Sequence, residues 1–222
     1  MIQILNLSKK YKDGTNSDFF ALQDINLEIS DNQCIVLKGS SGSGKSTLLS
    51  IIGAMNKPTN GAVLIDGVNF AKASDDVASE FRHKKIGYIF QFYNLIEELS
   101  VYENIAIPLH LSNISSEQKQ IIIKNAKKVA NFSKDDLSIV RDLSGGEKQR
   151  CAIARALVNS PEIILADEPT ANLDNENSII FVETIRKLKE LGKTIIIATH
   201  DQIFDNLEFI DKTINLKYGK IV

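Results

Sequence analysis

The sequence of 222 residues contains no tryptophan, four prolines and only two cysteines. Cys34 and Cys151 lie far apart and do not have the spacing of a metal-binding pair, so we expect buried thiols in a reducing compartment and no disulfide. The sequence also has no large excess of either charge, since the formal net charge is -2. This balance gives no bulk electrostatic reason to bind nucleic acid, and we expect no nucleic-acid partner.

Long apolar runs are absent too. The longest, at residues 163–166 and 195–198, fall far short of the roughly 20 residues that cross a bilayer. The first residues lack the basic start and apolar core of a signal peptide. We therefore expect a chain that is not secreted and that, if it works at a membrane, relies on other chains for the membrane spans.

What the sequence does have is 43% hydrophobic residues, enough for one large domain or a core with a subdomain. Four short segments rich in Ile, Val, Leu and Phe predict strands in the first third: 2–7, 20–29, 34–38 and 62–65. Residues 44–54 have apolar side chains at helical spacing directly after the third of these strands. Strand, glycine loop and helix thus follow one another, as in a βα phosphate site.

The middle of the chain changes character. Residues 98–158 favour helices, with candidates at 101–111, 117–131 and 146–158. The pattern predicts a helical insertion. No internal repeat and no heptad run long enough for a coiled-coil arm is present.

After this insertion the sheet core resumes. Two fully apolar runs, 163–166 and 194–198, flank an amphipathic helix at 178–191. This arrangement is typical of buried parallel strands joined by a crossover helix. A further short strand is predicted earlier, at 86–90.

A phosphate-binding loop follows the strand 34–38. Its pattern is formed by Gly39, Ser40, Ser41, Gly42, Ser43, Gly44, Lys45 and Ser46. Such a loop points successive backbone N–H groups at phosphates, and the following helix adds its positive end. Lys45 is then expected at the β- and γ-phosphates, the Ser46 hydroxyl on Mg²⁺, and Thr47 near the α-phosphate. A chance match has a probability on the order of one per cent, given average glycine usage.

Two adjacent carboxylates end the strand at 163–166. Asp167 is expected to hold Mg²⁺ through its shell, and Glu168, pointing the other way, to polarise the attacking water as general base. Alone, such a pair is a solvated turn in roughly three cases out of four. The phosphate loop in the same chain reverses that balance.

The run Leu143-Ser144-Gly145-Gly146-Glu147-Lys148-Gln149-Arg150 resembles the signature motif of ABC ATPases. Further landmarks of that family follow in order along essentially the whole chain: Gln91 resembles the Q-loop glutamine, residues 171–174 the D-loop, His200 the switch histidine and Tyr11 the aromatic residue that stacks on adenine. The resemblance implies an α/β fold: a P-loop NTPase core with a mixed sheet, an N-terminal antiparallel β subdomain and an inserted helical subdomain. The expected boundaries are about 1–91 and 159–222 for the core and about 92–158 for the helical signature subdomain.

The resemblance also implies an ATPase that uses ATP and Mg²⁺. Ser144, Gly145 and Gly146 open a helix, which makes an anion site. In this family that site faces the γ-phosphate held by the P-loop of a second copy, so two chains pack head to tail around two ATP molecules. His200 is implied at the γ-phosphate, and Gln91 as a sensor of Mg²⁺ or water.

Within the family, residues 90–96 and 101–105 resemble the LolD-like and MacB-like branch, whose members serve lipoprotein release or peptide and drug export. Glu147 stands where glutamine is commoner in the signature, a variant that this branch also contains. The implied partners are a second copy and a transmembrane permease. The implied location is cytoplasmic, peripheral on the inner face of the cell membrane.

Three other functions occur among proteins with such ATPase motifs. An FtsE-like regulatory ATPase, which controls a membrane partner in cell division or envelope signalling without transport, would carry the same motifs and stays open. A DNA-repair or chromosome ATPase would need a long coiled-coil insertion, and a translation factor would normally carry two cassettes, whereas this sequence ends at Val222 after one.

Overall fold

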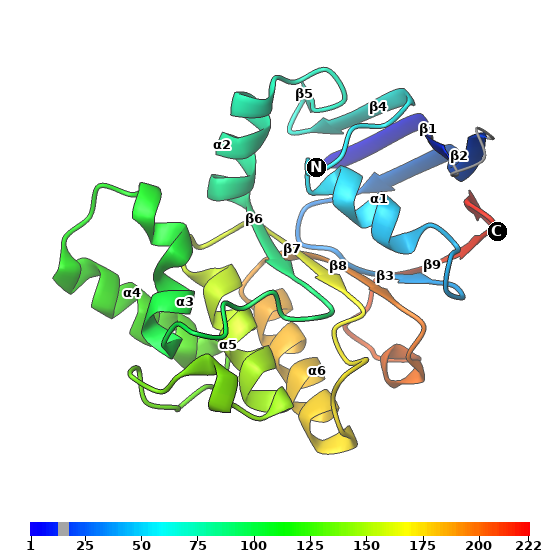
Figure 1. Cartoon of the computed structure of the whole chain (residues 1–222). Coiled ribbons are helices and arrows are strands. Elements are labelled where there is room, and N and C mark those ends of the chain that lie inside the picture. Colours follow the sequence, from blue (N-terminus) through cyan, green and yellow to red (C-terminus); the bar gives the residue numbers. More distant parts are fainter. Residues whose placement is uncertain (13–17) are drawn as a thin grey trace.

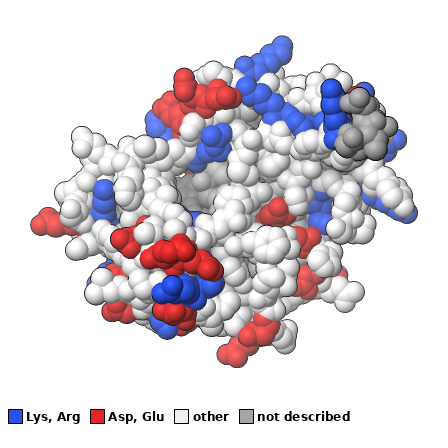
Figure 2. Space-filling view, in the orientation of Figure 1, with Lys and Arg blue, Asp and Glu red and all other residues white. Residues whose placement is uncertain are grey.

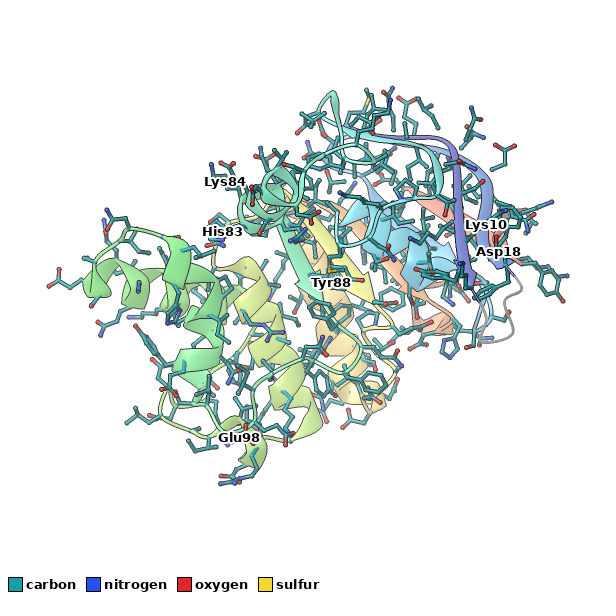
Figure 3. The ribbon with its side chains drawn as sticks, turned by 45° about the horizontal axis from the view of Figure 1, so that its top comes forward. Lys10, Asp18, His83, Lys84, Tyr88 and Glu98 are labelled. Carbon is teal, nitrogen blue, oxygen red and sulfur yellow. The ribbon has the colours of Figure 1, made fainter. Side chains whose placement is uncertain are left out.

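A computed structural model describes residues 1–12 and 18–222. Its N-terminal part is a four-stranded antiparallel sheet in the order β2-β1-β4-β5 (Figure 1). The strands are β1 (Ile2–Lys12), β2 (Asp18–Ile29), β4 (Asn60–Ile65) and β5 (Val68–Asn69). Where β1 ends and β2 begins, Lys10 Nζ lies 3.8 Å from Asp18 Oδ2 (Figure 3). This sheet is the antiparallel subdomain that the family resemblance implies.

A second sheet of six strands has the order β10-β9-β3-β8-β7-β6. Its strands are β3 (Cys34–Lys38), β6 (Ile86–Ile89), β7 (Ile163–Asp167), β8 (Thr194–Thr199), β9 (Lys212–Lys217) and β10 (Lys220–Ile221). All neighbours pair in parallel except β9 and β10, so the sheet is mixed, as expected. The predicted crossover is confirmed, since β7 and β8 are parallel neighbours joined through α6 (Asn175–Glu190).

Helices cover both faces of the mixed sheet. The described helices other than α6, some of which lie beside the sheet, are α1 (Lys45–Ile52), α2 (Asp75–Lys85), α3 (Val101–Ala106), η1 (Ile107–Leu111), α4 (Ser116–Val129), η2 (Val140–Asp142), α5 (Gly145–Leu157) and η3 (Gln202–Phe204). In Figure 1, α1 lies between the two sheets, α5 and α6 lie on the opposite side of the mixed sheet, and α3 and α4 extend away as a helical lobe.

Two apolar cores meet at the mixed sheet, and alternation along β3 shows how. Cys34 and Val36 pack in the core shared with α5 and α6, whereas Ile35 and Leu37 pack in the core shared with α1 and the antiparallel sheet. All four are 0% exposed. Strands buried on both faces need continuous apolar runs, which explains the short runs that the sequence shows. Polar residues are left for the carboxyl ends of the strands, where the candidate site lies.

Two predicted helices have different limits from those expected. The single helix predicted at 101–111 divides after Ala106 into α3 and the 3-10 helix η1, because Pro108 lacks the N–H that a continuing α-helix needs. The helix predicted from residue 178 begins earlier, at Asn175. The Asp174 side chain caps it by accepting a 2.8 Å bond from the Asn177 N–H.

Several elements were not predicted, chiefly α2 and β9. α2 is strongly polar and buries only Ala78, so it has no apolar stripe to reveal it. His83 and Lys84 project near its end in Figure 3. β9 buries Ile214 and Leu216 between exposed polar neighbours. This alternation of apolar and polar residues is typical of a half-buried strand and could have been used to predict β9.

The surface agrees with the balanced composition. On the face shown in Figure 2, acidic and basic side chains are interspersed. No helix among the residues that the structure describes is both long and apolar enough to cross a membrane.

Candidate functional site

The loop between β3 and α1 wraps around the first turn of α1, and its glycines make this possible. Gly44 has φ 106° and directly precedes the helix. A Cβ on Gly44 would lie 2.8 Å from Leu22 Cδ2 and 2.5 Å from the Ala21 carbonyl oxygen. Only glycine satisfies both the left-handed backbone and the close approach of β2. The loop therefore presents backbone at a helix N-terminus, which is the geometry of a phosphate site.

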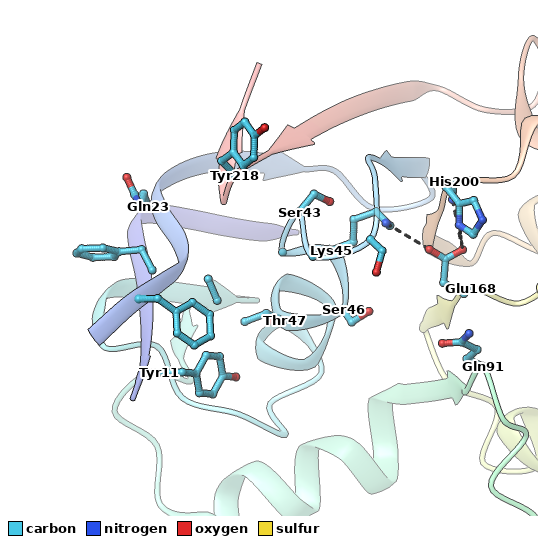
Figure 4. Close-up of a pocket in the computed structure, with 16 residues that line it drawn as sticks. Tyr11, Gln23, Ser43, Lys45, Ser46, Thr47, Gln91, Glu168, His200 and Tyr218 are labelled. Atoms are coloured by element: carbon cyan, nitrogen blue, oxygen red, sulfur yellow. Dashed lines mark hydrogen bonds and ion pairs between the residues drawn. The ribbon is translucent and has the colours of Figure 1, made fainter. Parts of the chain in front are cut away.

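Lys45 is folded back over this loop and is only 5% exposed. Its Nζ donates to the carbonyl oxygens of Gly39, at 2.7 Å, and Ser40, at 3.2 Å. It also lies 3.3 Å from Glu168 Oε1, as Figure 4 shows. A buried ammonium thus has two neutral acceptors and one carboxylate around it, and an incoming phosphate can take the place of the carboxylate.

Glu168 is held between two basic groups. Its Oε2 lies 3.0 Å from His200 Nδ1 and accepts the His200 backbone N–H at 3.3 Å. Burial acts to raise the pKa of Glu168, but the bond from His200 and the charge of Lys45 outweigh it, so the pKa lies below its ordinary value. The residue also has φ 42°, a strained value for a non-glycine residue that is found mainly where function requires it. The carboxylate is therefore ionised and fixed in direction.

Asp167 points to the other side, toward α1. Its Oδ1 accepts the Ser46 hydroxyl at 2.8 Å. Burial raises the pKa of Asp167 despite this bond. An added cation would relieve the cost of burying this carboxylate, since a nearby positive charge favours the ionised form.

The donors near Asp167 suit magnesium. Among residues 1–12 and 18–222 there is no cluster of three or more His, Cys, Asp or Glu that could hold a metal alone. Mg²⁺ typically takes one or two carboxylates together with substrate phosphates and water. The Ser46 hydroxyl, the Asp167 carboxylate and the amide of Gln91 fit that requirement.

A cavity of about 550 Å³ runs along this loop. It is lined by Tyr11, Phe19, Phe20, Ala21, Gln23, Ser41, Gly42, Ser43, Gly44, Lys45, Ser46, Thr47, Gln91, Glu168, His200 and Tyr218. In Figure 4, Tyr11 lies at one end and Glu168 and His200 at the other. An aromatic end and a cationic, N–H-rich end fit a nucleotide with its base and its phosphates respectively.

Ser43 gives an independent sign that this cavity suits a ligand with oxygen atoms. Its side chain is 3% exposed, and its Oγ has no hydrogen-bond partner among the described residues. Buried hydroxyls are normally paired, so an unpaired one in a phosphate loop fits an oxygen-rich ligand. Of the loop residues predicted, Gly39 and Ser40 lie behind the lining and take part through their bonds to Lys45.

The aromatic end contains residues that sequence reasoning missed. Tyr11 was expected, but Phe19, Phe20 and Tyr218 were not. Tyr11 pairs with Phe19 across β1 and β2, and their ring centroids are 6.0 Å apart. The antiparallel register could have revealed Phe19. No local signal reveals Tyr218, which reaches the loop because the Gly219 N–H donates to the Ser43 carbonyl at 3.1 Å.

Gln91 lines the same cavity, at the end of β6 (Figure 4). The loop behind it is firmly tethered. Asn172 Nδ2 donates to the Gln91 carbonyl at 2.9 Å, and Arg155 donates to the carbonyls of Tyr93 and Asn94 at 2.6 and 2.5 Å. Tyr93 and Asn94 both have positive φ, so Arg155 holds a strained turn in place.

Ser144, Gly145 and Gly146 are not brought to this cavity. They open α5, as predicted, with Ser144 as its N-cap. A Cβ on Gly146 would lie 2.8 Å from Asn177 Nδ2 and closer still to Oδ1, so α6 packs directly against this glycine. The exposed N-terminus of α5 is a second anion-type surface that the P-loop of the same chain does not use.

The phosphate loop, the paired carboxylates and the mixed sheet define the class as a P-loop NTPase. Residues 22–171 match the family model described as ABC transporter, and the chain belongs to that family.

Relatives agree along the full length. An uncharacterized ABC transporter ATP-binding protein of Methanocaldococcus jannaschii, MJ0796, is 39% identical over 226 residues, covering 100% of this chain and 95% of that protein. The lipoprotein-releasing system ATP-binding protein LolD of Buchnera aphidicola is 38% identical over 202 residues, covering 90% of this chain and 88% of LolD.

Solved structures lead to the same family. The dimeric post-hydrolysis structure of MJ0796 bound to ADP and Pi has a TM-score of 0.92 at 38% identity, covering 100% of this chain and 96% of that chain. CbiO1 from Clostridium perfringens, part of the transporter complex cbiONQ, has a TM-score of 0.87 at 30% identity, covering 100% and 86%. The chain is therefore an ATPase that binds ATP with Mg²⁺ and acts as the ATP-driven subunit of an ABC transporter.

Proposed function

We propose that this chain works as a homodimer with two ATP molecules between the copies and drives a transmembrane permease that exports or extracts lipoproteins, peptides or drugs. The observation that carries the dimer is the separation of the two anion surfaces. The P-loop cavity contains Lys45 and Glu168, whereas Ser144 at the start of α5 lies outside it. A head-to-tail pair brings the α5 N-terminus of one copy to the γ-phosphate held by the other.

Within each site, the roles follow from the contacts. Lys45 exchanges its ion pair with Glu168 for the β- and γ-phosphates, which frees the Glu168 carboxylate to polarise the attacking water. His200, already bonded to Glu168, turns toward the γ-phosphate and positions that water. ATP binding thus replaces the contacts that Lys45 and His200 make with Glu168.

The remaining residues hold the nucleotide and the metal. Ser46, Asp167 and Gln91 hold Mg²⁺, and Thr47 lies at the α-phosphate. Tyr11 stacks on the adenine. The backbone of the loop Gly39, Ser40, Ser41, Gly42, Ser43 and Gly44 surrounds the phosphates, while Ser144, Gly145 and Gly146 complete the partner's site.

The permease contact is supported by exposed apolar side chains after Gln91 and along η1. Phe92 is 71% exposed and Leu111 is 81% exposed. Large apolar side chains on a surface favour contact with another protein. The proposed helical subdomain, about 92–158, carries this surface, and the core is formed by about 1–91 and 159–222. Binding there keeps the chain at the inner face of the cell membrane.

The test is purification from native membranes of the Glu168→Gln variant in the presence of ATP, followed by mass spectrometry of the stoichiometric components. Omitting ATP and using Lys45→Ala provide matched controls. The proposal predicts an integral membrane protein at constant stoichiometry, and its identity narrows the cargo. A partner of the cell-division type would support a regulatory, FtsE-like role instead, and elution with soluble proteins alone would contradict both.

A further inference from the structure

The first turn of α5 carries a negative charge at an unexpected place. Glu147 Oε2 accepts the Ser144 backbone N–H at 2.9 Å, and Ser144 Oγ accepts the Glu147 N–H at 3.3 Å. These two bonds form a capping box, which stabilises the helix start. Glutamine makes the same bonds without a charge. Capping the helix therefore does not require the negative charge of Glu147.

That charge conflicts with the role proposed for this helix end, on which the present inference rests. The N-terminus of α5 attracts an anion through its free N–H groups and its dipole. A carboxylate on its first turn weakens the attraction for the polyanionic triphosphate of the facing copy, because like charges repel over this short range. Something must offset Glu147 if the two copies are to close around ATP.

Lys134 meets this need. It lies in the segment between α4 and η2, and its Nζ is 3.1 Å from Glu147 Oε1. Oε2 faces Ser144, so the two oxygens of Glu147 have separate partners. The bond from the Ser144 backbone, followed by the contact with Lys134, keeps the pKa of Glu147 below its ordinary value against the effect of burial. Glu147 is thus ionised near neutral pH.

Other charged side chains, including Asp135, line the hollow around this pair. Arg150 and Glu176 line the same hollow as Lys134 and Glu147. Arg150 Nη1 donates to Asn177 Oδ1 at 2.7 Å, which directs it toward α6. Among the residues that the structure describes, Lys134 is the cation bonded to the Glu147 carboxylate itself.

We propose that Lys134 is a positioning residue for the ATPase reaction, which neutralises Glu147 and so lets the α5 N-terminus bind the γ-phosphate presented by a second copy. Lys134 acts through Glu147 and does not touch the nucleotide. Its side chain is 40% exposed, and exposed ion pairs contribute little to folding. The loss of Lys134 therefore weakens dimer closure more than it weakens the fold.

The experiment compares four proteins in the Glu168→Gln background: the parent, Lys134→Gln, Glu147→Gln and the double variant. Sedimentation velocity measures the ATP concentration that gives half-maximal dimer. Lys134→Gln should raise this concentration about fivefold, since the dimer contains two such sites. Glu147→Gln keeps the cap and should stay within about twofold of the parent, and the double variant should return to the same range.

Two controls separate folding and nucleotide binding from this effect. Thermal unfolding and ADP affinity should be nearly the same in all four proteins, because ADP occupies only the P-loop cavity. A double variant as weak as Lys134→Gln, or a Lys134→Gln variant as strong as the parent, would overturn the inference alone. A parent that stays monomeric with ATP would overturn the proposed function, and this inference with it.

Discussion

The two anion surfaces of this chain are built in opposite ways. At the P-loop, one chain brings together a lysine, a carboxylate, a histidine and a hydroxyl that is unpaired among the described residues, around a cavity of about 550 Å³. At the start of α5, the polar groups are a helix N-terminus and its own cap. The first surface has the parts of a reaction site, and the second has only those of an anion contact. The comparison indicates that catalysis and dimer contact are separate tasks, which substitutions can separate.

The largest effect should come from Glu168→Gln. The variant keeps the shape of the side chain but loses the charge that polarises water, so hydrolysis should fall by about 10²- to 10⁴-fold. Its ATP affinity should be retained. Phosphate release measures the first property, and nucleotide titration the second; normal turnover would remove Glu168 from the role of base.

Lys45→Ala should act on binding. Hydrogen bonds to charged groups contribute roughly 1.5–3 kcal/mol, so ATP affinity should fall about 10- to 100-fold. Lys38→Ala is the control, because Lys38 pairs with Asp205 at 2.8 Å and does not line the cavity. Equilibrium binding of a fluorescent ATP analogue distinguishes them, and equal affinity in both variants would speak against the P-loop role.

Gly146→Ala should affect the other surface. The added methyl overlaps the Asn177 amide, and overpacking of this kind costs about 1–3 kcal/mol of unfolding free energy. Gly145→Ala is a matched control, since its Cβ would lie 3.4 Å from both the Asn172 carbonyl oxygen and the Tyr93 hydroxyl. Urea unfolding should give Gly146→Ala a clearly lower free energy of unfolding than Gly145→Ala. Adding Asn177→Ala to Gly146→Ala should recover the lost stability. Equal stability of the two would show that α6 does not restrict this glycine.

The smallest effect concerns Asp167 in the absence of nucleotide. Burial raises the folded-state pKa of Asp167 above its ordinary value, so the ionised form destabilises the protein when no cation or nucleotide is bound. Asp167→Asn should therefore increase the free energy of unfolding at neutral pH. The gain should shrink as the pH falls through the raised pKa, and it should vanish below the ordinary pKa of an aspartate, where Asp167 is protonated in both states. Unfolding in urea at a series of pH values without Mg²⁺ checks this; a gain that is independent of pH would contradict the assignment.

The strand, loop and helix around Gly39 to Ser46 were predictable, because a local glycine pattern and apolar runs determine them. α2 was not, since a helix that buries only Ala78 has no periodicity to detect. The break at Pro108 could have been anticipated from the missing N–H. Tyr218 could not, because a distant hairpin brings it to the loop.

The sequence was enough to predict the motifs of the candidate site, but it did not predict the side-chain contacts between them. The sequence predicts roles for Lys45, Glu168 and His200, yet only the structure shows that Glu168 contacts both of the other two. Likewise, the signature pattern does not reveal that Lys134 meets Glu147, since nothing in local sequence pairs them. Contacts between elements depend on tertiary packing, which sequence periodicity does not encode.

The measurement that tests the central claim most directly is sedimentation velocity of Glu168→Gln with ATP, with and without the additional change Ser144→Arg. The account predicts a dimer for Glu168→Gln and a monomer for the double variant, while both bind ATP with similar affinity. Dimerisation of both proteins, or of neither, would contradict the claim that the α5 N-terminus of one copy completes the site of the other.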